Sequence, residues 1–318
     1  MMRLAAAAFA VGLALSPAAS MAQAKYPVPT VTLATHSSAG GGSDVFLREL
    51  VKHVQPIIGA NLAVSNITGG SGARAMAELA KSPANGSIFY ATTPTYIQTT
   101  LLSKPAVGYD QLDPMVIVFF DPTIIYTRTE SPHKTFADVV ADAKKNVGKQ
   151  KWGAANPASL ERIAFEKLNK ITGAKAAIVS HEGGGDLMIN VLNGTLDIGV
   201  GEVQELRSQI EAKKVRLLAV LGDKRLPELP DLPTAKEQGV DLVVSKFRGL
   251  AGPKGVPDDV AKMWEDAVKK ALASPAYKDV YSKEALEPVA LGREQARAFT
   301  AKFADEVKAS LTELGVIK

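Results

Sequence analysis

Short apolar runs that favour strands alternate with amphipathic runs that favour helices along most of this chain, and this alternation is the strongest constraint on its fold. Residues 31–34, 63–64 and 88–91 are apolar runs of strand length, while 44–58 carries its apolar residues at helical spacing. The same alternation resumes after residue 120 and continues to residue 221. Alternation of this kind predicts parallel sheets covered by helices.

One segment departs from the alternation and indicates two lobes. Residues 116–129 are rich in Val, Ile, Phe and Tyr and are interrupted only by Asp121-Pro122, so we expect extended chain that crosses between lobes. A chain of 318 residues is also long for one core. The proline-rich segment 227–233 and the stretch 243–253 are expected to bring the chain back.

We therefore expect an α/β fold of two lobes, each a mainly parallel sheet flanked by helices, with a hinge of crossing strands. The predicted boundaries are 25–123 plus 224–318 for lobe 1 and 124–223 for lobe 2.

The first residues have the three parts of a secretory signal peptide. A basic start at Arg3 precedes an apolar run over 4–15, and the small-residue ending Ala22-Gln23-Ala24 follows. The apolar run is shorter than the roughly 20 residues that span a bilayer, and no later run is longer. We expect export with cleavage after Ala24, and the alternative is an N-terminal helix of the folded protein.

Composition excludes several classes of site. The sequence has no cysteine, so it forms no disulfide, thiolate metal site or cysteine nucleophile. Its 37 basic and 33 acidic side chains are interspersed, which argues against a nucleic-acid surface. The segment 69–74 superficially resembles a phosphate loop, but no GKS or GKT follows, and no full dinucleotide fingerprint is present. We expect no cofactor and no nucleic-acid partner.

Three glycine-containing loops connect a predicted strand to a predicted helix, at 35–44, 153–159 and 180–186. In open parallel sheets ligands bind beyond the carboxyl ends of strands. Glycine lets the backbone approach a ligand closely, and the unpaired amides of a helix start favour an anion. Ser37, Ser38 and Ser43 add hydroxyl groups to the first loop, and Thr93 follows the third strand. The alternative for the first loop is an ordinary turn with Ser43 or Asp44 as helix N-cap.

Histidines offer the main catalytic alternative. His36 and His181 each lie in one of these loops, so a hydrolase that uses either imidazole with Glu182 remains open. None of the four histidines has metal-ligand spacing with another, and the G-x-S-x-G motif is absent. We expect a binding protein without a metal, and not an enzyme.

Several segments together resemble the substrate-binding proteins of tripartite tricarboxylate transporters, also called Bug receptors, over nearly the whole chain after residue 24. They are the run AGGGSDVFLREL with Asp44 and Arg48, residues 64–66 with 69–73, residues 82–87, residues 182–184 with 192–197, the run VRLLAVLGDKRLPELPDLPTAKEQG and residues 247–253. The resemblance implies a periplasmic, two-lobed receptor, expected to be monomeric, that passes a small organic acid to integral-membrane transporter subunits. It also implies that the two C-terminal helical segments pack on lobe 1.

In that family a carboxylate is held by backbone and hydroxyl donors from both lobes. Carried onto this chain, the positions are Ser37, Ser38, Gly41, Gly42, Thr93, Ala155, Asn156, Gly183 and Gly184. Glu202 is expected at the far end of the site. Two loops depart from the family pattern, with His36 and with His181-Glu182 in place of aromatic and basic residues, so we expect a mono- or dicarboxylate, which could be aromatic, rather than a tricarboxylate. A ligand-dependent sensor for a membrane kinase would have the same receptor sequence.

Overall fold

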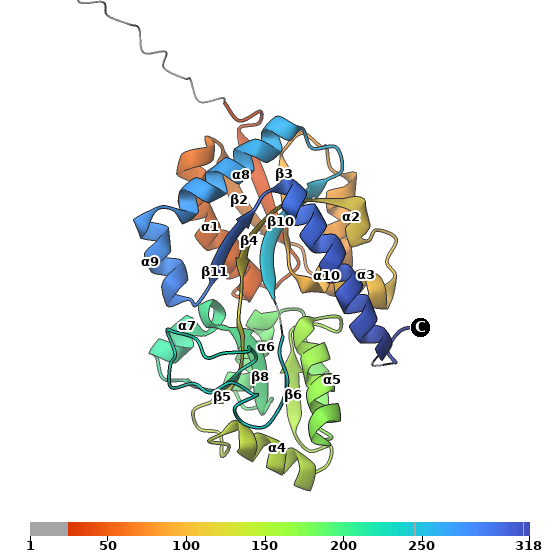
Figure 1. The fold of residues 1–318 in the computed structure, drawn as a ribbon, viewed down its shortest axis with the longest axis vertical. Helices are drawn as coiled ribbons and strands as arrows, with labels where there is room; N and C mark the ends of the chain where they lie inside the picture. The colour runs from red at the N-terminus through yellow and green to blue at the C-terminus, as the bar shows by residue number, and fades with distance from the viewer. Residues whose placement is uncertain (1–24, 245, 314) are drawn as a thin grey trace, which may run out of the picture.

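Two sheets organise the residues that this computed structural model describes, which are 25–244, 246–313 and 315–318 (Figure 1). The predicted signal peptide, residues 1–24, lies outside them. The larger sheet has the strand order β11 (Glu287–Leu291), β4 (Leu112–Phe120), β10 (Phe247–Pro253), β3 (Ile88–Thr92), β1 (Thr30–Thr35), β2 (Asn61–Asn66). The smaller sheet has the order β7 (Ala177–Ser180), β6 (Lys151–Ala154), β8 (Ile198–Glu202), β5 (Thr123–Arg128), β9 (Val215–Val220).

Helices cover both faces of each sheet. On the larger sheet these are α1 (Gly42–Ile58), α2 (Ala73–Lys81), α3 (Pro94–Ser103), α8 (Asp258–Leu272), α9 (Pro275–Lys283) and α10 (Arg293–Glu313). On the smaller sheet they are α4 (Phe136–Lys145), α5 (Leu160–Thr172), α6 (Gly184–Leu192) and α7 (Val203–Glu211). Short 3₁₀ turns lie at Gly70–Gly72 and Tyr109–Gln111. The two C-terminal segments expected on lobe 1 correspond to α8 and α10, and both pack there.

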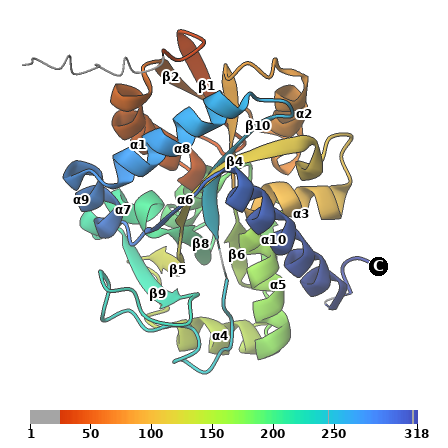
Figure 2. The same ribbon diagram turned by 45° about the horizontal axis from the view of Figure 1, so that its top comes forward.

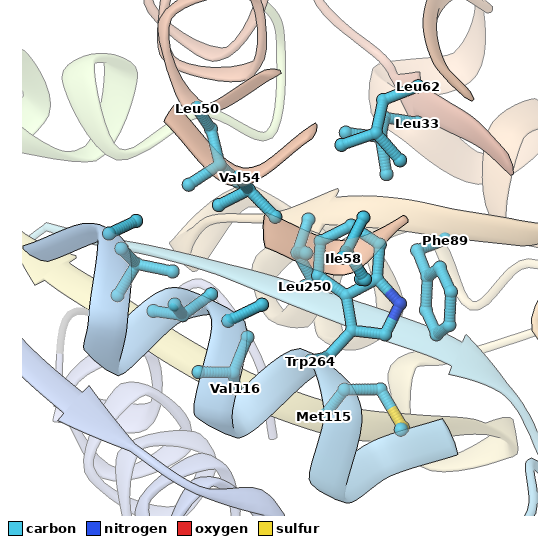
Figure 3. Packing of buried hydrophobic residues seen from close by; sticks show 14 of the residues in the cluster. Leu33, Leu50, Val54, Ile58, Leu62, Phe89, Met115, Val116, Leu250 and Trp264 are labelled. Carbon is cyan, nitrogen blue, oxygen red and sulfur yellow. The ribbon is translucent and has the colours of Figure 1, made fainter. Parts of the chain in front are cut away.

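The core of lobe 1 explains why α1 and α8 form where they do. The buried positions of α1 follow a helical spacing, and the helix ends at Gly59, whose left-handed backbone (φ 77°) suits glycine. Leu50, Val54 and Ile58 pack with Trp264 of α8 over one face of the larger sheet (Figure 3). The opposite face is covered by α2, α3 and α10.

The smaller lobe includes a long irregular segment. Ala235, Val240 and Leu242 belong to the same apolar cluster as Trp152 and Phe165 of that lobe. Because those side chains are buried against the smaller sheet, we propose that the second boundary lies near residue 246, instead of the boundary at 224 expected from the sequence.

Crossing strands connect the lobes (Figures 1 and 2). The chain leaves the larger sheet at the end of β4, passes Asp121-Pro122 and enters the smaller sheet as β5; it returns as β10, which pairs with β4. Both β5 and β10 run antiparallel to their neighbours, so the two sheets are mixed where the sequence predicted mainly parallel ones. An apolar run in the sequence indicates that a strand is buried, but it does not indicate whether that strand is parallel or antiparallel to its neighbours.

Within the described residues, every helix is too short or too polar to traverse a lipid bilayer.

Candidate functional site

The first glycine loop lies between β1 and α1, and its conformation is stabilised by the carboxylate of Asp44. Asp44 Oδ2 accepts a hydrogen bond from the amide of Gly40 at 2.9 Å, and Arg48 donates to the same carboxylate. The N-cap is Gly41, in extended conformation and without a side-chain capping bond. The alternative of Ser43 or Asp44 as an ordinary N-cap is therefore wrong. Asp44 therefore stabilises the loop through Gly40 and does not cap the helix. The first amides of α1 have no side-chain cap.

His36, in this loop, is a buried neutral imidazole. Its Nδ1 lies 2.6 Å from the phenol oxygen of Tyr90. Burial lowers the pKa of His36 to about 4, and the nearby charges of Lys246 and Arg248 act in the same direction. Burial raises the pKa of Tyr90, so the phenol keeps its proton and donates it to Nδ1. With the Tyr90 hydroxyl as donor to Nδ1, the single N–H proton of the neutral imidazole lies on Nε2, and His36 is then a neutral donor.

The third glycine loop, at the start of α6, meets the first loop across the gap between the lobes. A Cβ atom added to Gly185 would lie 2.3 Å from the carbonyl oxygen of Ala39, and one added to Gly183 would lie 2.5 Å from the amide nitrogen of Ser38. Side chains at these positions would collide with the backbone of the opposite lobe. The glycines are thus required for close approach, and the lobes are closed in this structure.

The second loop and the loop after β3 complete the walls of the cleft. Ser159 caps α5, and Asn156 Oδ1 accepts from the amide of Ala158 at 3.2 Å. Thr93 caps α3 by accepting from the amide of Thr95. Asn156 and Thr93 are both buried. Each loop is therefore ordered by its own helix cap before any ligand contact is considered.

These loops enclose a cavity of about 30 Å³, which admits only a few water-sized groups. Ten of the predicted site residues line it: His36, Ser37, Gly42, Ser43, Thr93, Ala155, Asn156, Gly183, Gly184 and Glu202. Ser38 and Gly41 lie beside it, where the two glycine loops touch. His181 and Glu182 do not line it, and Glu182 is exposed. A ligand the size of a dicarboxylate requires the lobes to separate.

Thr95, in the loop that follows the third strand, also lines the cavity, and so do five residues that the sequence did not point to: Glu161, Val200, Glu205, Lys246 and Arg248. Most of them are charged and buried. Arg248 is the clearest signal in retrospect, because it stands inside the apolar run of β10. A charge in a buried strand demands a partner, but the sequence does not say which one.

Arg248 is the centre of a buried ionic network. Its Nε donates to Asp121 at 2.7 Å, its Nη1 to the Ser43 hydroxyl at 3.0 Å and its Nη2 to Glu202 at 2.9 Å. Burial raises the pKa of Asp121 to about 6, against the opposing charge of Arg248. The guanidinium thus joins the crossing strands, the first glycine loop and the end of β8.

Lys246 extends the network to α5. Its ammonium donates to Glu161 at 2.8 Å and also pairs with Glu202. Although burial works against the charged form, the carboxylates of Glu161 and Glu202 raise the pKa of Lys246. Both cations of the cavity are therefore already neutralised by protein carboxylates. An anion that entered this cavity would meet neutral donors and helix starts instead of an unpaired positive charge.

The described residues contain no group of three or more His, Asp or Glu side chains arranged to hold a metal ion. They also contain no hydrogen bond between Glu182 and either His36 or His181. The arrangement fits binding of a polar group by amides, hydroxyls and a neutral imidazole.

Comparison with known proteins places this fold among solute receptors. The family described as tripartite tricarboxylate transporter family receptor matches residues 46–316. The UPF0065 protein in the TAR-I ttuE-ttuC' intergenic region of Agrobacterium vitis is 28% identical over 298 residues, which cover 92% of this chain and 85% of that protein.

Two solved structures are similar over 92% of this chain. The periplasmic binding protein BugD has a TM-score of 0.86 at 23% identity and is covered to 100%. R. palustris Rpa4515 with adipate has a TM-score of 0.86 at 22% identity and is covered to 99%. Their likeness confirms the expected two-lobed α/β fold.

Proposed function

This chain belongs to the family of tripartite tricarboxylate transporter receptors, and on that premise we propose that it captures a small organic acid between its lobes and delivers it to a membrane transporter. The observation that carries the proposal is the meeting of two glycine-lined helix starts, at Gly41 and Gly183, from opposite lobes. Both starts lack side-chain caps, so their amides are available to an anion. The adipate bound to the similar protein Rpa4515 supports a carboxylate as that anion.

Capture is a change in population between open and closed lobes. A ligand that bridges both loops binds the closed form more tightly and shifts the equilibrium toward it. The crossing strands at Asp121-Pro122 and near residue 246 are the connections about which the lobes would move. Small changes in backbone angle at a few residues of this kind produce large lobe motions. The closed surface is then what a membrane partner recognises.

The ligand-binding residues in this proposal are those of the cavity. Ser37, Gly42, Asn156 and Gly184 supply hydroxyl, amide and carboxamide groups, and His36 supplies Nε2–H. Neutral donors hold a carboxylate through charge-assisted hydrogen bonds. Ser38, whose hydroxyl is buried without a hydrogen-bond partner among the described residues, is placed to join them when the lobes separate around a ligand.

We propose a receptor without catalytic activity. A hydrolase would need a base held by an orienting acid within hydrogen-bonding reach. His36 is tied to Tyr90 and neutral, while Glu182 points to the surface. Retention of ligand unchanged after prolonged incubation is the expected result, and any turnover that requires His36 or His181 would restore the enzyme alternative.

Export and the partner are also proposals. The segment 1–24 is proposed to direct secretion to the periplasm, with cleavage after Ala24, and integral-membrane transporter subunits are the proposed partner of a monomeric receptor. Mass spectrometry of the secreted protein tests the cleavage site through its mass. Pull-down from membranes separates a transporter from a sensor kinase as the partner.

The central experiment is identification of the bound molecule. Native mass spectrometry of freshly purified protein is expected to show a small acid that is released on denaturation. Purified protein is then screened by thermal unfolding against a panel of mono-, di-, hydroxy- and aminocarboxylates. A ligand at 100 times its Kd adds about 2.7 kcal/mol, which raises Tm by roughly 4 °C for a chain of this size. No shift with any carboxylate would contradict the proposed function.

A further inference from the structure

Glu205 of α7 is a buried acid that the closed cavity leaves without a partner. The residue is 7% exposed and lines the cavity. Its Oε1 is buried and has no hydrogen-bond partner among the residues that the structure describes. Buried polar atoms in folded proteins nearly always have a partner, so an orphan of this kind requires an explanation.

The carboxyl group of Glu205 lies directly against two glycines. A Cβ atom added to Gly184 would lie 1.8 Å from Oε1, and one added to Gly201 would lie 3.0 Å from Oε2. Any side chain at Gly184 would displace the carboxyl group from the start of α6. The chain therefore keeps room for this acid at the same loop that supplies amides to the cavity.

Neither cation of the cavity satisfies Glu205. Arg248 donates to Asp121, Ser43 and Glu202, and Lys246 donates to Glu161 and Glu202. Burial, and then the charge of Glu202, raise the pKa of Glu205 well above its usual range, with Lys246 and Arg248 opposing. The carboxyl group thus keeps its proton, and among the described residues neither Lys246 nor Arg248 forms an ion pair with it.

The lining of the cavity therefore combines two chemically different kinds of group. Neutral donors of the glycine loops and His36 favour an anion, whereas Glu161, Glu202 and Glu205 are acids, of which Glu202 lies against Gly42 and Glu205 against Gly184. A second carboxylate on the ligand would meet these acids with no free cation to offset them. A cationic amino group would find the unpaired carboxyl group of Glu205, which would ionise and release its proton to solvent.

We propose that this cavity selects a short amino carboxylate over a dicarboxylate, with the ligand carboxylate against the glycine loops and its ammonium group against Glu205. The proposal rests on the proposed function, because it names the ligand class of the same cleft. It makes Glu205 a specificity-determining residue. An ammonium paired with a desolvated carboxylate forms charge-assisted hydrogen bonds, which are about twice as strong as neutral ones.

Ligand pairs matched in length test the selection. Isothermal titration calorimetry compares β-alanine with malonate and γ-aminobutyrate with succinate. The amino member of at least one pair is expected to bind about tenfold more tightly or better. Titration in buffers of different ionisation enthalpy is expected to show release of about one proton per amino ligand at pH 7. A dicarboxylate is expected to release none.

The Glu205→Gln variant, which is nearly isosteric, tests the assigned residue. It is expected to weaken the amino ligand about tenfold, to abolish proton release and to leave the dicarboxylate unchanged or tighter. The control is Glu211→Gln on the same helix, whose side chain is 69% exposed. This control is expected to match the wild type in affinity and in proton release.

The outcomes separate this inference from the proposed function. A wild type that prefers the dicarboxylates, or proton release that survives in Glu205→Gln, would overturn the inference while leaving the receptor in place. Binding of other carboxylates from the wider panel, without binding of either amino ligand, has the same meaning. If no carboxylate of any kind binds, the proposed function itself fails. Proton release by the wild type gives a result even if the variant does not fold.

Discussion

Two adjoining parts of the cleft, which we call the glycine wall and the ionic floor, differ in how their buried polar groups are hydrogen-bonded or paired. The glycine wall, residues 36–43 and 183–185, offers neutral hydrogen-bonding groups from backbone amides, serine hydroxyls and the imidazole of His36. The ionic floor, formed by Asp121, Glu161, Glu202, Lys246 and Arg248, consists of charges that satisfy one another. The wall is therefore open to a ligand, whereas the floor is occupied by its own partners.

This difference suggests separate roles: the wall is proposed to recognise the ligand, whereas the floor fixes how the two lobes are joined. The floor joins the crossing strands to β8 and, through Ser43, to the first loop. Replacing a buried ion pair by apolar residues is often neutral, but removing one partner leaves a charge uncompensated. The floor thus adds little net stability, yet any single loss from it is costly. The wall has the reverse property, since changes there alter binding and spare the fold.

The largest effect is expected from Arg248→Met, which breaks the floor. Methionine fills a similar volume but leaves the carboxylates of Asp121 and Glu202 without their guanidinium. We expect a loss of about 3–5 kcal/mol in the free energy of unfolding. Urea unfolding followed by circular dichroism at pH 7 measures it.

The matched control is Arg225→Met. Arg225 pairs with Glu237, and both side chains are more than two-fifths exposed, at 44% and 45%. Exposed pairs contribute about 0–1 kcal/mol, so this variant should unfold close to the wild type. Equal losses in the two variants would show that the floor is no different from a surface ion pair.

The next largest effect is expected from Gly185→Ala, which breaks the wall. The added methyl group would lie 2.3 Å from Ala39 O of the opposite lobe, so the loops cannot meet and the ligand loses donors from one side. Loss of two charge-assisted hydrogen bonds weakens ligand binding about 100-fold. Stability should be unchanged or slightly higher, since alanine favours the helix that contains this position. Calorimetry and thermal unfolding measure the two quantities.

Gly222→Ala serves as the control for this change. There the added methyl group meets Val220 Cγ1 at 3.4 Å, an ordinary contact within one lobe. Unchanged affinity is expected. If Gly185→Ala binds as tightly as Gly222→Ala, closure does not depend on the approach of the glycine loops.

The contrast between wall and floor also explains how much the sequence could predict. The alternation of apolar runs predicted the two lobes and most elements, because burial leaves a periodic pattern. Runs of glycine before Gly42 and Gly184 predicted the wall, because close approach of backbone restricts residue type locally. The mixed sheets were not predicted, because strand direction leaves no such mark.

The floor could not be predicted for a different reason. Glu161, Glu202 and Lys246 of the floor come from distant parts of the chain and meet only in the folded protein. Singly, Glu161 looks like an acid of a first helical turn, and Glu205, which lies beside the floor, looks like a surface residue of an amphipathic helix. Nothing local to such a residue specifies the charges that it will face in the folded protein.

A smaller effect is expected within the wall, at the imidazole of His36. The variant Tyr90→Phe is compared with the double variant His36→Phe, Tyr90→Phe, so that no buried phenol is left unpaired. Removing one neutral donor should weaken the ligand by about tenfold in the double variant relative to the single one. Calorimetry with the tightest ligand of the panel measures this ratio, and equal affinities would exclude His36 from recognition.

The protonation state of His36 also predicts how ligand affinity should depend on pH. Because the pKa of His36 is lowered to about 4, the imidazole stays neutral above pH 5. Affinity of the wild type for a monocarboxylate without an amino group should therefore show no titration step near pH 6.5. A rise in affinity as the pH falls through that value, if it is lost in the double variant His36→Phe, Tyr90→Phe, would mean that a charged imidazole holds the ligand.

The smallest effect is expected at a pair outside the cavity, here called the rim, in which Glu284 of lobe 1 faces Arg207 of lobe 2 at 3.6 Å. Burial raises the pKa of Glu284 to about 7. Below about pH 4.5 the group is neutral in the folded and unfolded chains, and its burial costs nothing. Above pH 7 it is ionised in both, and the cost is fully present. Because the charge of Arg207 offsets part of this cost, Glu284→Gln should raise stability by only about 1 kcal/mol at pH 8, with no gain near pH 4.5.

The control is a glutamate whose replacement is expected to change the free energy of unfolding in the opposite direction. Hydrogen bonds from the amide of Thr234 and from Arg225 hold the pKa of Glu237 below its usual range, so Glu237→Gln should lower stability at pH 8. Urea unfolding of both variants at the two pH values gives four differences. If Glu284→Gln is destabilising at pH 8, the Arg207 pair outweighs the burial of the acid. The ion pair between Glu284 and Arg207 would then help to hold the lobes closed. Unlike the ion pairs of the floor, this pair could be broken at little cost in free energy when the lobes open.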